Sequence, residues 1–132
     1  MTPIRIHTEL GIVEAEAAAR DGLTAHGFGV LTEIDVAATF KAKLAIDRPP
    51  LKILGACNPH LAHRALDVDP DAALVLPCNV VLETTSEGTT VTAADPHDIL
   101  PNPALKELAD DAANRLRAAL DSIPTTTDRR TI

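Results

Sequence analysis

Aromatic side chains are scarce in this chain, and basic side chains are outnumbered by acidic ones. There is no Trp and no Tyr among the 132 residues, and the aromatics are limited to Phe28 and Phe40. Proteins bind single-stranded nucleic acid by stacking its bases on aromatic side chains, and this chain has too few of them for that. The 12 Lys and Arg against 19 Asp and Glu give a net charge of −7, which disfavours a surface that follows phosphates. The sequence therefore predicts no nucleic-acid partner.

Long apolar runs are also absent. No run approaches the roughly 20 residues that a membrane-spanning helix requires. The first residues, Met1 to Ile6, lack the basic start and apolar run of a signal peptide. We therefore predict a cytoplasmic protein without a membrane partner. Because the cytosol keeps thiols reduced, the only two cysteines, Cys57 and Cys78, are predicted to be free thiols. The sequence leaves open whether they are close in space.

The apolar pattern predicts one small α+β domain. A chain of 132 residues can bury one hydrophobic core without disulfides or a metal. We assign residues 1–123 to this domain and residues 124–132 to a loose polar tail. Alternation of apolar and polar residues predicts strands, and spacings of three and four residues predict helices. The expected strands are 3–7, 30–34, 51–54, 73–83 and 89–93, and the expected helices are 12–25, 36–44, 59–66 and 105–120.

The strand expected at residues 73–83 determines the sheet type. It turns back at residues 86–88 and pairs with residues 89–93, so the sheet is expected to be mostly antiparallel, with helices packed on it. Pro77 cannot donate a hydrogen bond to a neighbouring strand. We therefore expect the strand to carry a bulge at Pro77 or to lie at a sheet edge there.

Both cysteines lie between Gly55 and Asn79. The strand 51–54 is expected to stop at Gly55, and Asn58 followed by Pro59 is typical of a helix start. Cys57 would then lie just before a helix N-terminus, whose partial positive charge favours the thiolate. A structural role is the alternative, since free cysteine is among the most buried residue types.

A metal site is an alternative interpretation of the same stretch. Cys57, His60 and His63 form a C-x2-H-x2-H spacing, with the two histidines one turn apart on a helix. A tetrahedral site needs a fourth ligand, for which Cys78 or His97 would have to come close. Since the sequence does not provide that ligand nearby, no metal is predicted. A soft metal held by Cys57, Cys78, His60 and His63 remains the alternative.

Two further patterns predict no reaction. Asp95, His97 and Asp98 form a carboxylate-imidazole group in a proline-rich loop, but no nucleophile turn accompanies them, so we interpret them as loop polarity. Gly27 and Gly29 precede a strand and not a helix, so they do not form a phosphate-binding loop. Whether the protein is an enzyme, and which cofactor it would use, stays open.

Several separate motifs resemble those of the DUF302 family. They are GFGVLTEIDV (27–36), ILGACNP (53–59), Ala62, Ala65-Leu66, LPCNVV (76–81) and Asp95-Pro96. The motifs occur in order over residues 1–121 at fitting distances. The resemblance implies a β-α-β-rich antiparallel sheet with helices packed on it, similar to the TBP-like arrangement, and a homodimer. It implies no activity, and it assigns no role to His60 or His63.

The main functional hypothesis is a small-ligand-binding or sensing module. Cys57, Asn58, Cys78 and Asn79 are the residues expected to contact an unidentified small molecule, because paired Cys-Asn dipeptides flank the candidate turn. One alternative is a thiol-redox, sulfur-handling or soft-metal-binding protein that uses Cys57 and Cys78. The other alternative is a structural dimerisation domain with both cysteines in its core.

Overall fold

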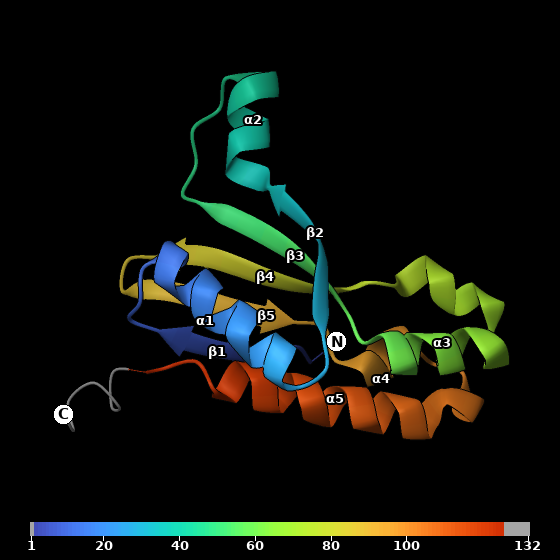
Figure 1. Cartoon of the computed structure of the whole chain (residues 1–132). Coiled ribbons are helices and arrows are strands. Elements are labelled where there is room, and N and C mark those ends of the chain that lie inside the picture. Colours follow the sequence, from blue (N-terminus) through green and yellow to red (C-terminus); the bar gives the residue numbers. More distant parts are fainter. Residues whose placement is uncertain (1, 126–132) are drawn as a thin grey trace.

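The protein is built on one five-stranded antiparallel sheet, seen in a computed structural model that describes residues 2–125 (Figure 1). The strands lie in the order β1-β5-β4-β3-β2. They are β1 (Ile4–Thr8), β2 (Gly29–Asp35), β3 (Leu51–Cys57), β4 (Cys78–Thr85) and β5 (Gly88–Ala93). The predicted α+β class with a mostly antiparallel sheet is confirmed.

Helices cover one face of this sheet. α1 and α5 pack against each other, and each contacts strands of the sheet. The helical elements are α1 (Ile12–Ala25), α2 (Val36–Leu44), α3 (Pro59–Val68), the 3-10 helix η1 (Pro70–Val75), α4 (Pro96–Ile99), the 3-10 helix η2 (Pro103–Leu105) and α5 (Lys106–Asp121). None of the helices in residues 2–125 combines the length and hydropathy needed to cross a membrane.

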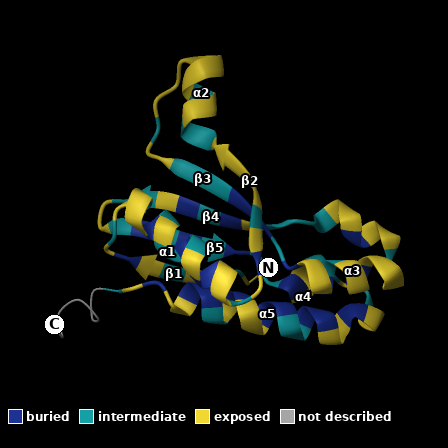
Figure 2. Ribbon diagram, viewed as in Figure 1, coloured by how far each residue is buried: buried dark blue, intermediate teal, exposed yellow. Residues whose placement is uncertain are grey.

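The main core lies between the sheet and the helices α1 and α5. Leu54, Val80 and Leu82 are fully buried there, because alternate residues of β3 and β4 point toward the helices. The residues between them point to the opposite face, on which Asn79 and Glu83 are exposed. Figure 2 shows this division between buried and exposed positions along the strands.

A second apolar cluster lies beyond the end of the sheet, where α3, η1 and η2 meet the first half of α5. Its buried members are Leu61, Ala65, Ala72, Leu105, Leu108 and Ala112. The helix α3 therefore starts at the end of the sheet and packs on this second cluster.

The prediction of one long strand over residues 73–83 is wrong in its first half. Asp69 caps the 3-10 helix η1 by accepting a hydrogen bond from the Asp71 N–H, and Pro70 takes the first helical position. The strand begins only at Cys78, after Pro77, which has no N–H to donate. β4 is a central strand, so the expectation of a bulge or an edge at Pro77 is also wrong.

The strands β2 and β3 extend away from the rest of the molecule and carry α2 at their far end (Figure 1). We call residues 31–50 the arm. The predicted helix 36–44 is confirmed, and Asp35 caps it by accepting a 2.9 Å hydrogen bond from the Ala38 N–H. No residue of α2 is buried (Figure 2). Most of the predicted tail, residues 126–132, lies outside the described residues.

Candidate functional site

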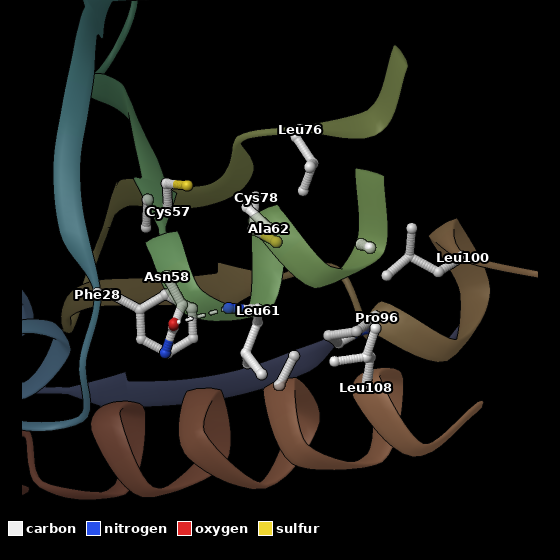
Figure 3. Close-up of a pocket in the computed structure, with 13 residues that line it drawn as sticks. Phe28, Cys57, Asn58, Leu61, Ala62, Leu76, Cys78, Pro96, Leu100 and Leu108 are labelled. Carbon is white, nitrogen blue, oxygen red and sulfur yellow. Dashed lines mark hydrogen bonds between the residues drawn. The ribbon is translucent and has the colours of Figure 1, made fainter. Parts of the chain in front are cut away.

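Both cysteines line one apolar cleft, at the place where the main core meets the second cluster (Figure 3). Its walls come from β3, α3, β4, α4 and α5, and from the segments before β2, before β4 and after α4. They are Phe28, Ala56, Cys57, Asn58, Leu61, Ala62, Ala65, Leu76, Cys78, Pro96, Leu100, Leu108 and Ala112. Residues that are far apart in the sequence therefore surround the two thiols.

The pairing of β3 with β4 brings the thiols to this cleft. Ala56 is the register partner of Cys78, so Cys57 lies diagonally across from Cys78 on the neighbouring strand. β3 continues to Cys57 and does not stop at Gly55, which corrects the predicted boundary. A side chain at Gly55 would overlap the Thr32 side chain and approach the Pro77 ring. Both cysteines are free thiols and partly exposed.

The apolar surroundings disfavour both thiolates. Burial raises the pKa of the Cys57 thiol. Burial, followed by the nearby Cys57 charge, raises the pKa of Cys78 to about 11. These directions are the opposite of the thiolate expected from the helix N-terminus. The described lining residues include no lysine, arginine or histidine that would favour a negative sulfur.

Asn58 is buried and acts as the predicted N-cap of α3. Its Oδ1 accepts a hydrogen bond of 3.2 Å from the Leu61 N–H. The same side chain lies against Gly27, where an added Cβ would lie 2.9 Å from Asn58 Nδ2. The cap therefore ties the start of α3 to the turn before β2 and fixes one wall of the cleft.

The structure does not bring the other sequence candidates to the cleft. Asn79 lies opposite Gly55 on β4, is exposed, and does not line the cleft. His60 is exposed, and His63 lies 3.7 Å from Asp67, one turn along α3. Within residues 2–125, no three His, Cys, Asp or Glu side chains are grouped so as to hold a metal ion. The metal alternative therefore lacks a ligand cluster there.

Sequence reasoning missed the wall that faces the cysteines. Leu108 and Ala112 of α5 and Leu100 after α4 line the cleft, although they are more than 40 positions from Cys57. The four-residue spacing of Leu108 and Ala112 identifies one apolar stripe of a helix. That spacing does not reveal which surface the stripe covers.

The cleft is narrow and adjoins a larger hollow. Its volume of about 30 Å³ accommodates no more than a water molecule or two. A second hollow of about 420 Å³ lies between η1 and the segment from α4 to η2, and Leu100 lines both spaces. A ligand larger than water would have to displace partly buried side chains such as Leu76 and Leu100.

The sequence around the cleft and over nearly the whole chain matches a family model. The family model of DUF302, a domain of unknown function, matches residues 4–123. The chain belongs to the DUF302 family. The crystal structure of an uncharacterized conserved DUF302 protein from Bacillus stearothermophilus superposes on it with a TM-score of 0.86. The two are 30% identical, and the match covers 94% of this chain and 99% of that one. No curated protein matches this chain.

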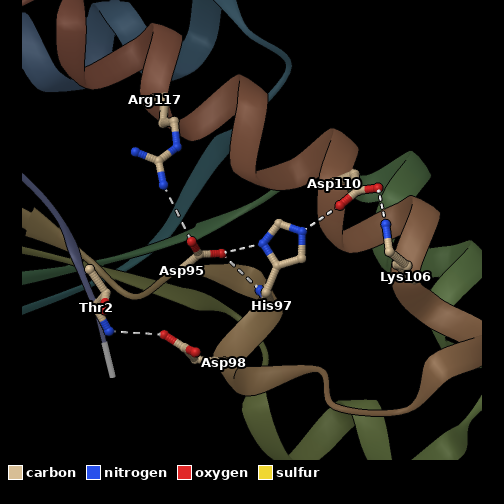
Figure 4. Close-up of polar contacts among 7 residues, drawn as sticks. All are labelled: Thr2, Asp95, His97, Asp98, Lys106, Asp110 and Arg117. Carbon is tan, nitrogen blue, oxygen red and sulfur yellow. Dashed lines mark hydrogen bonds and ion pairs between the residues drawn. The ribbon is translucent and has the colours of Figure 1, made fainter.

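A polar cluster on the surface of this DUF302 domain joins α4 to α5 (Figure 4). His97 Nδ1 lies 2.6 Å from Asp95, and its Nε2 lies 2.5 Å from Asp110. Arg117 contacts Asp95 at 3.4 Å, and Lys106 contacts Asp110 at 3.1 Å. Asp95 and His97, which the sequence analysis interpreted as polar loop residues, therefore belong to a network of ion pairs in which His97 links two carboxylates.

The network shifts the pKa values of its members. The hydrogen bonds to Asp110 and then Asp95 raise the pKa of His97 above its usual 6.5. The His97 and Lys106 contacts lower the pKa of Asp110. Burial alone would raise the pKa of Asp95, but the hydrogen bonds to His97 outweigh it, so the pKa of Asp95 is lowered. Protonated His97 therefore stabilises the fold fully below pH 6.5, and this contribution is lost as pH rises through its folded pKa.

We expect His97→Gln to make the stability less dependent on pH. The variant should be less stable than the wild type near about pH 5.5, and the difference should shrink at a pH well above the raised pKa, where the wild-type imidazole has lost its proton. Urea unfolding followed by circular dichroism at both pH values measures the two free energies. His60→Gln, at an exposed position outside the network, is the matched control. An equal loss of stability at both pH values would contradict the expectation.

Proposed function

We propose that this DUF302 domain binds a small apolar ligand in the cysteine cleft and acts as a binding or sensing module. The observation that carries the proposal is the apolar lining that surrounds two partly exposed thiols, at the junction of two core clusters. Ligand sites are concave and mostly apolar, with few polar groups that orient the ligand. Cys57, Cys78 and Asn58 supply those groups here.

The position of the cleft also supports a sensing role. Its walls belong to two separately packed clusters. Leu76 and Leu100 pack against the second cluster and are only partly buried. A ligand that displaces these two side chains would change how α3 and the segment after α4 pack together. Asn79 takes no part in this proposal, because it lies outside the cleft.

The test uses benzene and 1-butanol as probes of an apolar site, since apolar cavities take up such molecules. The methyl NMR signals of Leu76 and Leu100 should shift in a saturable way when a probe is added to the wild-type protein. Ala62→Leu fills the cleft and should abolish these shifts. Ala118→Leu is the matched control, because Ala118 is a partly exposed helical alanine outside the cleft.

Two outcomes would refute the binding proposal. The first is the absence of any saturable shift at the cleft methyl groups. The second is the same shift in Ala62→Leu as in the wild type, because the probe would then bind elsewhere. A thermal-unfolding series with each probe should agree, since a ligand that binds only the native state raises the unfolding temperature.

A second candidate function is reversible thiol chemistry. The observation that favours it is that both free thiols line one cleft and come from neighbouring strands. An added disulfide such as oxidised glutathione would accept two electrons and two protons while Cys57 and Cys78 form one bond. Mass spectrometry of the folded protein detects the loss of two hydrogen atoms. If the bond forms only after unfolding, the thiols have a structural role.

A further inference from the structure

The larger of the two spaces beside Leu100 has the size of a small-molecule pocket. It lies between η1 and the segment from α4 to η2, and we call it the η1 hollow. Its volume of about 420 Å³ falls in the range of about 300–1,000 Å³ that is usual for ligand pockets, whereas the cysteine cleft offers about 30 Å³. A molecule of several heavy atoms can therefore enter the η1 hollow without displacing core side chains.

Apolar side chains from both sides line the η1 hollow and remain open to water. Leu74 of η1 is 84% exposed, and Val75, Ile99 and Leu100 are partly exposed. Apolar surface that gathers around a concavity is typical of a binding site, because a bound apolar group removes this surface from water. The shape and the lining of the hollow therefore both favour a ligand with an apolar body.

Side-chain hydrogen bonds hold the two sides of the hollow together. Asn102 Nδ2, at the start of η2, donates a 3.3 Å hydrogen bond to Asp69 Oδ2, at the start of η1. The other oxygen of Asp69 accepts a 3.0 Å hydrogen bond from the Asp71 N–H, and Asn102 Oδ1 accepts a 2.9 Å hydrogen bond from the Ala104 N–H. The same two side chains thus cap both 3-10 helices. The hollow is therefore preformed, so a ligand does not have to order its walls.

The charge on the walls of the hollow is negative. Among the described residues that line it, Asp69 and Asp71 carry a charge, and none is a lysine, an arginine or a histidine. Each oxygen of Asp69 already accepts one hydrogen bond. The Asp71 carboxylate, in contrast, makes no ion pair or hydrogen bond with the part of the chain that the structure describes. Asp71 is therefore an acceptor that is free for a positively charged donor.

We propose that the η1 hollow binds a small amphipathic cation, with an ammonium group at the Asp71 carboxylate and an apolar chain against Leu74 and Val75. The ammonium group has only donors and the carboxylate only acceptors, so the two are complementary, whereas an anion would be repelled. Among the described residues, Leu100 alone lines both the hollow and the cysteine cleft. The site is therefore separate from the cleft, and the proposal does not depend on a ligand there.

Three probes with the same alkyl chain test the charge and the apolar body separately. They are n-hexylamine, 1-hexanol and hexanoate at about pH 7, where an alkylamine is protonated like lysine. The methyl NMR signals of Val75 report on the η1 hollow, and the ring signals of Phe28 report on the cleft. In the wild type, hexylamine should bind at Val75 about threefold more tightly than 1-hexanol, as expected for an exposed ion pair. Hexanoate should bind more weakly than either, and high salt should reduce the preference for the amine.

Asp71→Asn is the decisive variant, because it removes the charge and keeps the shape of the side chain. Its affinity for hexylamine should fall about threefold, to that for 1-hexanol. Its binding of 1-hexanol should not change, which also shows that the variant is folded. Asp21→Asn, at an exposed position of α1 outside the hollow, is the matched control and should bind both probes as the wild type does. Leu74→Ser should weaken both probes alike, because it removes part of the apolar wall.

Four results would overturn the proposal. The first is the absence of a saturable shift at Val75 when hexylamine is added. The second is equal binding of hexylamine and either of the other two probes, and the third is an Asp71→Asn variant that keeps the preference for the amine. The fourth is a shift at Phe28 without one at Val75, because the probe would then lie in the cleft. That last result would support the cleft as a ligand site, so the two sites are tested separately.

Discussion

Cys78 is expected to react with the thiol reagent DTNB about 100-fold more slowly than an ordinary cysteine at the same pH, because its thiolate is that much rarer. Burial, and then the charge of Cys57, raise its pKa from 9.0 to about 11. The rate should therefore keep increasing about tenfold per pH unit beyond the pH at which an ordinary thiol levels off. Stopped-flow absorbance measures the rate, and the urea-unfolded protein provides the unperturbed reference.

Cys57→Ser is the matched variant for this experiment. It leaves Cys78 as the only thiol and removes a charge that raises the pKa of Cys78, so the Cys78 rate should increase modestly. Cys78→Ser leaves only Cys57, which is less shielded and should react faster than Cys78. If Cys78 in the folded protein reacts as fast as in urea, the apolar cleft does not shield it. The thiol-chemistry function would then gain support over ligand binding.

Gly22→Ala is expected to destabilise the protein by about 1–3 kcal/mol, the usual effect of overpacking. In an exposed helix the same change stabilises by about 1 kcal/mol, because glycine is a poor helix former. Here α1 crosses α5 so closely that the new Cβ would lie 2.5 Å from the Ala119 carbonyl oxygen. That oxygen belongs to the backbone of α5, so the helices must move apart and the packing over the sheet loosens.

Urea unfolding followed by far-UV circular dichroism measures this change in the free energy of unfolding. Gly29→Ala is the control, because an added Cβ at Gly29 meets nothing within 4 Å. The control should change stability by no more than about 0.5 kcal/mol, as is usual for surface positions. A Gly22→Ala variant more stable than the wild type would show that α1 and α5 are not in close contact in solution.

The local elements of this protein are determined by its sequence. Alternation and helical spacing predicted every strand and most helices, because these patterns report which side of an element is apolar. Asn58 was identified as the start of a helix from the sequence, because a cap depends on only three or four consecutive residues. The predicted strand is wrong over residues 73–77, because the cap at Asp69 and Pro70 start a 3-10 helix there and Pro77 has no N–H to donate to a neighbouring strand.

The candidate site was decided by the tertiary structure. Cys57 and Cys78 were named from the sequence, but the helix α5 that faces them was not, since no local pattern says which surface Leu108 covers. The pKa directions also came from packing, because burial outweighs the helix N-terminus that the sequence suggested. Spacing along the chain reports local geometry, whereas desolvation and shape depend on residues brought together from distant positions.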